Sequence, residues 1–270
     1  MVRLAALSIL SVLVSGCGPE RVEVKVPPLE DRASDLTFVE PEPVVEGVLL
    51  RLNPKASAKV SNALVGRIDV APVPGKPSVP KQAIGATTIS MGYTISVARA
   101  DAASVSLAFT SSSLKFEGTA KGEWEQRGGQ TGEVRFDRRA ALLEDPASLF
   151  EGLFGAGMFV FPETAVAPGS TWSSENTRDM PPFGPVRITE RFTYKGMESR
   201  DGTLVHRVDS AATGSLEGMT MSATYYVRED GLPFGASVKT KAESPIATDA
   251  EGKQVWAAFT VDVEIGPAKK

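Results

Sequence analysis

Apolar side chains recur at every second position over most of the chain, from about Val45 to Ile265. Near the end, one face of such a segment carries Val255, Ala257, Phe259, Val261, Val263 and Ile265. Ala258, Thr260, Asp262 and Glu264 fall on the other face, where Trp256 is the exception. A period of two with one polar face is typical of antiparallel strands that bury one side. The pattern therefore restricts the chain to a mainly β fold.

Turn sequences separate these alternating segments. Asp201-Gly202, Asp230-Gly231, Glu251-Gly252 and Gly128-Gly129 are suited to tight hairpins. Between Phe109 and Leu114 the apolar parity switches, which indicates a turn or bulge near Ser111–Ser113. The segments amount to about twelve strands. We expect one large antiparallel sheet, curved into a half-barrel or sandwich.

One segment has helical rather than strand periodicity. Asp145 can cap a helix, Pro146 suits its first turn, and Gly155 ends it. Apolar side chains on one side of this helix are Leu149, Phe150, Leu153 and Phe154. We expect one short helix packed against the sheet. It closes one end of the core or forms a lid over a hydrophobic cavity.

The N-terminus has the layout of a secretory signal: Arg3, a largely apolar run from Leu4 to Val14, then small residues before Cys17. That run makes a helix of about 16 Å, too short for a bilayer core of about 30 Å. Val14-Ser15-Gly16-Cys17 resembles the lipobox of bacterial lipoproteins. The resemblance implies cleavage between Gly16 and Cys17 and lipid modification of Cys17. An ordinary secretory signal followed by a stray cysteine is the alternative.

The rest of the chain divides around this anchor. Residues 17–44 are rich in proline and acids and read as a tether, residues 45–266 as the β domain, and residues 267–270 as a disordered tail. By the same resemblance, Gly18 favours the outer membrane over inner-membrane retention. We therefore expect a lipid-anchored protein of the cell envelope whose contact with the membrane is made by its lipid.

Charge and cysteine content exclude some classes of partner. Loss of residues 1–16 removes Arg3, so the 29 basic residues become 28 against 33 acidic ones, a net charge of −5. This balance argues against a nucleic-acid partner, which needs a basic face. Cys17 is the single cysteine, so no intrachain disulfide can form.

A second resemblance rests on the stretch from Pro162 to Trp172, which ends in Gly169-Ser170-Thr171-Trp172. Together with the alternating segment Val186–Tyr194 and the turn at Asp201-Gly202, it resembles a family of uncharacterised β-rich bacterial lipoproteins with a Gly-x-x-Trp motif. The resemblance spans about residues 140–240 and implies no particular activity.

Residues with catalytic chemistry are few. His206 is the single histidine and has the parity of the apolar face, so we interpret it as structural. One histidine and one acylated cysteine cannot build a zinc site, and the sequence predicts no cofactor. Glu190 also has apolar parity, between Ile188 and Phe192. A buried carboxylate needs a partner or a raised pKa, and such acids sometimes mark sites.

Three interpretations of function follow. The first is a non-catalytic β domain for binding or structure that holds an apolar ligand, with candidate lining residues Met91, Phe192, Met219, Met221 and Tyr225. The alternative is a carboxylate-dependent hydrolase that acts on envelope polysaccharide, which needs two facing acids. A component of an envelope assembly is the third. Without a catalytic constellation, we expect no enzyme.

The anchor gives a direct prediction. A Cys17→Ser variant should lose membrane association, because no thiol remains to carry acyl chains, each of which contributes about 0.8 kcal/mol per buried methylene. Detergent-phase partitioning of cell extracts measures this. Partitioning of the variant into detergent, as for the parent chain, would refute lipidation at Cys17.

Overall fold

The computed structural model describes residues 47–268 except 78–80, 82–83, 113, 119–128, 144–158, 180–184, 216–217 and 250. The expected signal peptide, Cys17, the tether and the helix at Asp145–Gly155 lie outside the described residues. Within the described part of the chain, no helix is long and apolar enough to cross a membrane.

The described chain forms eleven strands, close to the number expected from the sequence. Their bounds are β1 Lys59–Ala71, β2 Gly85–Ala100, β3 Ser104–Ser111, β4 Lys115–Gly118, β5 Thr131–Asp137, β6 Thr171–Asp179, β7 Pro185–Arg200, β8 Thr203–Gly214, β9 Thr220–Arg228, β10 Pro233–Thr248 and β11 Gln254–Pro267.

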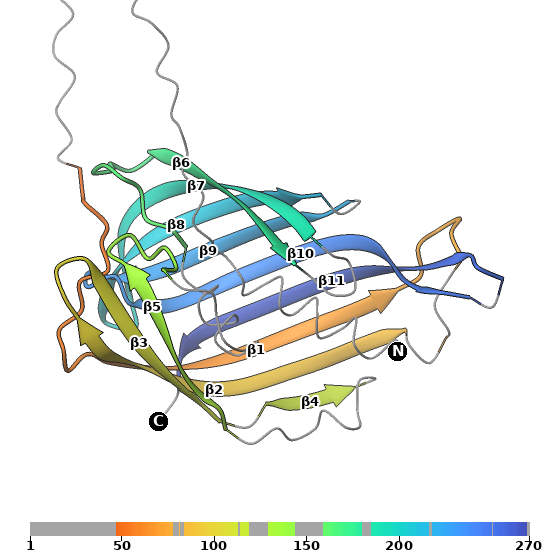
Figure 1. Ribbon diagram of the computed structural model, residues 1–270, viewed down its shortest axis with the longest axis horizontal. Coiled ribbons are helices and arrows are strands. Elements are labelled where there is room, and N and C mark those ends of the chain that lie inside the picture. The colour runs from red at the N-terminus through yellow and green to blue at the C-terminus, as the bar shows by residue number, and fades with distance from the viewer. Residues whose placement is uncertain are drawn as a thin grey trace, which may run out of the picture.

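All eleven strands belong to one antiparallel sheet in the order β5-β3-β2-β1-β11-β10-β9-β8-β7-β6. The short strand β4 pairs with β2 beyond the stretch that β3 occupies. No pairing joins β5 to β6, so the described sheet is open rather than a closed barrel. In Figure 1 the sheet is curved, with β3 and β5 rising at the left and β6 and β7 arching at the top. The prediction of one large antiparallel sheet is confirmed.

Because neighbouring strands pair in register, residues that alternate along each strand line up in rows across the sheet. Directly paired residues share a face. One row runs Phe192, Ser210, Ala223, Val238, Val263, Gly66, Ile89 and Phe116. The apolar members of this row are buried, whereas Arg67, Asp262 and Lys239 form a row on the opposite face. We call the buried face the inner face.

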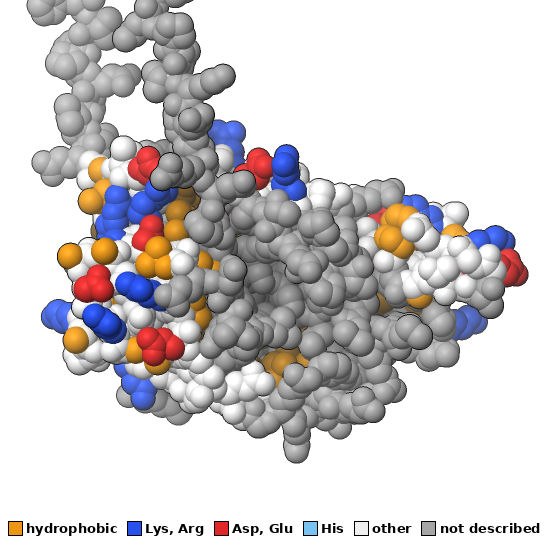
Figure 2. Space-filling model, viewed as in Figure 1, with side chains coloured by type: hydrophobic (Ala, Val, Ile, Leu, Met, Phe, Trp, Pro, Cys, Tyr) orange, Lys and Arg blue, Asp and Glu red, His pale blue; other side chains and the backbone are white. Residues whose placement is uncertain are grey.

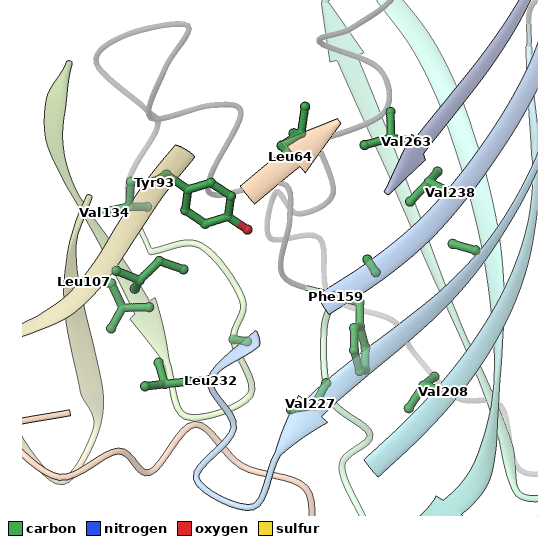
Figure 3. Packing of buried hydrophobic residues seen from close by; sticks show 14 of the residues in the cluster. Leu64, Tyr93, Leu107, Val134, Phe159, Val208, Val227, Leu232, Val238 and Val263 are labelled. Carbon is green, nitrogen blue, oxygen red and sulfur yellow. The ribbon is translucent and has the colours of Figure 1, made fainter. Parts of the chain in front are cut away.

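Buried side chains on the inner face form one main core. Tyr93, Leu107 and Val134 come from β2, β3 and β5, and Figure 3 shows them across from Val208 and Val238 of β8 and β10. Because fully burying one such aliphatic side chain contributes about 1.5–3 kcal/mol, this face dominates the stability of the domain.

The turns have the backbone that their sequences predict. Asp201 and Gly202 both have positive φ, 48° and 75°, as a type I′ hairpin requires. Gly231 and Gly252 also have positive φ, at 81° and 80°. Near the C-terminus β11 continues to Pro267, one residue past the expected end of the domain. Pro267 pairs with Asn62, and the Ala268 amide donates to the Ser61 carbonyl, because β1 extends far enough to pair with both.

Gly231 and Gly252 give a matched test of how residues 47–53 pack on the β9–β10 turn. A Cβ at Gly231 would lie 2.3 Å from the Arg51 carbonyl oxygen, whereas one at Gly252 would meet nothing within 4 Å. Alanine should cost about 1–2 kcal/mol of backbone strain at either position. We expect about 1–3 kcal/mol more at Gly231→Ala, from overpacking. Urea unfolding of both variants measures the difference; equal losses would show that this packing is absent in solution.

Candidate functional site

Five aromatic side chains meet on the inner face next to β6, β7 and β9. The ring of Phe159 lies 5.2 Å from Phe161, 5.4 Å from Phe192 and 4.9 Å from Tyr225, measured between centroids. Trp172 stacks on Phe192 at 5.3 Å. We call these five residues the aromatic cluster. Offset and edge contacts at these distances add about 0.5–1.5 kcal/mol per pair beyond burial.

The Gly-x-x-Trp motif positions this cluster. Gly169 has φ of 94°, and its amide donates to the Tyr194 carbonyl, which brings the chain onto β7. Three residues later, the Trp172 indole donates to the Val160 carbonyl at 2.9 Å. The motif therefore holds the segment that carries Phe159 and Phe161 against the sheet.

A buried carboxylate lies beside the aromatic cluster. Glu190 of β7 is 6% exposed and is the only acid in the described chain that is buried. The Tyr225 hydroxyl donates to its Oε1 at 3.2 Å. The parity of Glu190 in the sequence predicted this burial, and the structure confirms it. This donor is a phenol from β9, two strands away from β7 in the sheet.

Unlike the Glu190 carboxylate, three other buried polar atoms on the inner face have no hydrogen-bond partner among the described residues. They are the Ser210 and Thr240 hydroxyl oxygens and Oδ1 of Asn62. An unsatisfied buried polar group costs about 1–3 kcal/mol. Sequence reasoning missed all three, although each interrupts an apolar alternation. That interruption was the signal available.

A small pocket adjoins the aromatic cluster where β9 turns into β10. Its lining residues are Phe159, Phe161, Tyr225, Tyr226, Val227, Gly231, Pro233 and Gly235. The register of β9 and β10 shifts between Pro233 and Gly235, which loosens the pairing at this point.

The structure separates the five candidate lining residues. Phe192 and Tyr225 join the aromatic cluster, and Met221 is four residues before Tyr225, on the same face of β9. Met91 packs against the main core from β2, four strands away from β9. Met219 belongs to a small cluster with Ile188 and Ala212, against which Met221 also packs. The structure therefore brings Phe192 and Tyr225 together and Met219 and Met221 together, and it leaves Met91 apart.

His206 of β8 is buried, as its parity predicted, and its Nδ1 lies 2.9 Å from the Tyr194 hydroxyl. Burial lowers the pKa of His206, and the charge of Glu229 opposes this in part. The imidazole is therefore neutral at pH 7. In the tautomer with its proton on Nε2, Tyr194 donates to Nδ1. This agrees with a structural role.

Three arginines join distant segments at the end of the sheet that carries the aromatic cluster. Arg51 donates to the carbonyls of Pro162 and Glu163, at 2.7 and 2.6 Å. Arg138 donates to the Leu52 carbonyl and Arg139 to the Phe161 carbonyl. Burial and the nearby Arg139 lower the pKa of Arg51. In Figure 2, basic, acidic and hydrophobic side chains lie intermixed at the left end of the molecule.

Comparisons with known proteins do not assign the chain to a family. No protein-family model and no curated protein sequence matches the chain. Among solved structures, DynF from the dynemicin biosynthesis pathway of Micromonospora chersina is similar at 11% identity, over 89% of this chain and 94% of that one, with a TM-score of 0.22. A score this low carries no argument about this chain. Among the described side chains, no group of three or more His, Cys, Asp and Glu could hold a metal ion.

The buried histidine predicts a pH dependence of stability. The pKa of His206 is lowered in the fold from its ordinary value of 6.5. As pH falls below 6.5, His206 is therefore protonated in the unfolded chain before it is protonated in the folded one. This contribution to stability is present above pH 6.5 and is lost as pH falls. The free energy of unfolding, measured from pH 7.5 to 5, should fall more steeply in the parent chain than in His206→Gln. Parallel curves would show that His206 titrates normally in the fold.

Proposed function

We propose that this chain is a lipid-anchored envelope protein whose β domain binds an apolar ligand at the aromatic cluster. The anchor is supported by the signal layout and lipobox around Cys17. The observation that carries the ligand is the aromatic cluster and its adjoining pocket on the inner face of an open, curved sheet.

The chemistry of this site favours apolar contact. Phe159, Phe161 and Val227 contribute hydrocarbon surface to the pocket. Transfer of apolar ligand surface from water to such a lining yields about 25 cal/mol per Å². Binding sites of this kind are largely apolar with a few polar groups, and Tyr225, whose hydroxyl donates to Glu190, is among the residues that line this pocket.

The hydrolase alternative has less support. It needs two acids facing each other at about 5–9 Å. The described residues contain one buried carboxylate, Glu190. Binding is therefore the function that the geometry supports best, and the hydrolase stays an untested prediction.

A brominated acyl chain can show where the ligand binds, because bromine quenches the fluorescence of a tryptophan that it contacts. Trp172 lies in the aromatic cluster, whereas Trp256 lies on the outer face under the Lys76 ammonium group. In a Trp124→Phe background, which removes the third tryptophan of the chain, methyl 9,10-dibromostearate should quench the parent and Trp256→Phe, and quench Trp172→Phe much less. The two variants are matched, because each removes one indole and keeps an aromatic ring. Absent quenching, or quenching that disappears with Trp256 instead, would contradict the proposal.

A further inference from the structure

The pocket beside the aromatic cluster is too small for the ligand that the proposed function requires. It has room for about one water molecule, whereas sites for small organic ligands measure about 300–1,000 Å³. Phe159 and Phe161, which line it, are 6% and 2% exposed. One wall of the pocket must therefore move before an acyl chain can enter.

The two walls of the pocket are held in different ways. Tyr225, Val227 and Gly235 belong to β9 and β10, which pair with each other through a backbone ladder. The other wall is formed by residues 159–163, which belong to no strand, and Figure 3 shows Phe159 beside Val227. We call residues 159–163 the lid segment. Because local opening favours segments with few backbone bonds, the lid segment is the wall that can move.

Four consecutive carbonyl groups of the lid segment accept hydrogen bonds from side chains. They belong to Val160, Phe161, Pro162 and Glu163. Trp172 donates to the first at 2.9 Å and Arg139 to the second at 3.0 Å. Arg51 donates to the third and the fourth, at 2.7 and 2.6 Å. The lid segment can therefore leave the sheet without breaking a strand ladder, and Arg51 makes two of the four bonds that oppose this.

The backbone around Arg51 is fixed to the other wall of the pocket. Two residues later, the Asn53 amide donates to the Asp230 carbonyl at 2.8 Å, in the turn between β9 and β10. Gly231 of the same turn lines the pocket, and a Cβ there would collide with the Arg51 carbonyl. Arg51 thus joins the two walls, with its backbone on the turn and its guanidinium group on the lid segment.

We infer that the proposed site is self-inhibited: Phe159 and Phe161 occupy the place of the apolar ligand, and Arg51 is the latch that keeps them there. When the lid segment swings away, an acyl chain takes the place of the Phe159 ring, whose centroid lies 4.9 Å from Tyr225 and 6.3 Å from Trp172. The apparent affinity is then the intrinsic affinity reduced by the fraction of molecules that are open. The inference rests on the proposed function and adds its regulation.

The latch is tested by variants that loosen it to different degrees. In the full chain with Trp124→Phe and Trp256→Phe, Trp172 is the single tryptophan and reports methyl 9,10-dibromostearate by quenching. Arg51→Met keeps the aliphatic stem and removes every donor. It should bind the probe faster and about tenfold more tightly, because even one hydrogen bond to a charged group corresponds to about that factor. Arg51→Lys, which loses the fork of the guanidinium group, should gain about threefold.

The matched control and a measurement without ligand complete the test. Arg67→Met removes an exposed arginine that pairs with Asp69 on the outer face, and it should leave binding unchanged. The Phe161 amide donates to the Arg139 carbonyl at 2.8 Å, so its hydrogen exchange reports opening of the lid segment. Arg51→Met should speed this exchange about tenfold and leave the Tyr225 amide unchanged, whereas a general loss of stability would speed both.

The outcomes separate the two proposals. If the probe quenches neither the parent chain nor the variants, the proposed function fails and the inference fails with it. If the parent is quenched but Arg51→Met binds no more tightly, or its Phe161 amide exchanges no faster, the proposed function stands and the inference is wrong. If Arg51→Met does not fold, Arg51→Lys decides by the same two measurements.

Discussion

The inner face of an open sheet must be covered, and the rest of this structure depends on how that is done. A closed barrel covers its interior with its own strands, whereas here β5 and β6 stay unpaired with each other. At one end, the cover is the segment that carries Phe159 and Phe161. The Trp172 indole holds it from the sheet side, and the Arg51 guanidinium group holds it from the N-terminal side. Removal of either contact would expose the aromatic cluster to water.

The covered face is not uniform along the sheet. From β1 to β5 the buried inner side chains are mostly large, with Leu64, Ile95, Leu107 and Phe109 among them. On β8 to β10 large apolar side chains such as Val208, Val227 and Val238 alternate with small or polar ones, which are Ser210, Ala212, Ala223, Ala236 and Thr240. Large side chains that interdigitate fill their own space, whereas small ones leave it to whatever packs against them. The small side chains on β8–β10 are nevertheless buried, so neighbouring side chains such as Met219 and Met221 fill the space beside them.

Alternation in the sequence predicted which face each strand buries, and with it the burial of Glu190 and His206. It could not predict what lies opposite. Parity puts Met91 and Met221 on the same face, but the strand order separates β2 from β9 by four steps. The sequence also could not predict the arginine contacts, because Arg51 and the Pro162 carbonyl are 111 residues apart and no periodicity relates them. The sequence likewise could not predict that Trp172 of the Gly-x-x-Trp motif holds the segment at Val160, because nothing in the motif indicates which carbonyl accepts from its indole.

Buried polar groups on the inner face of β7 to β10 differ in how their hydrogen bonds are satisfied. Two phenols face the two buried ionisable groups: Tyr225 donates to Glu190, and Tyr194 donates to His206 in the tautomer with its proton on Nε2. Each phenol thus uses its one donor on an acceptor of the protein. The Ser210 and Thr240 hydroxyls have no such acceptor among the described residues. Each buried hydroxyl without a partner costs about 1–3 kcal/mol, so the apolar contacts around them must offset this cost.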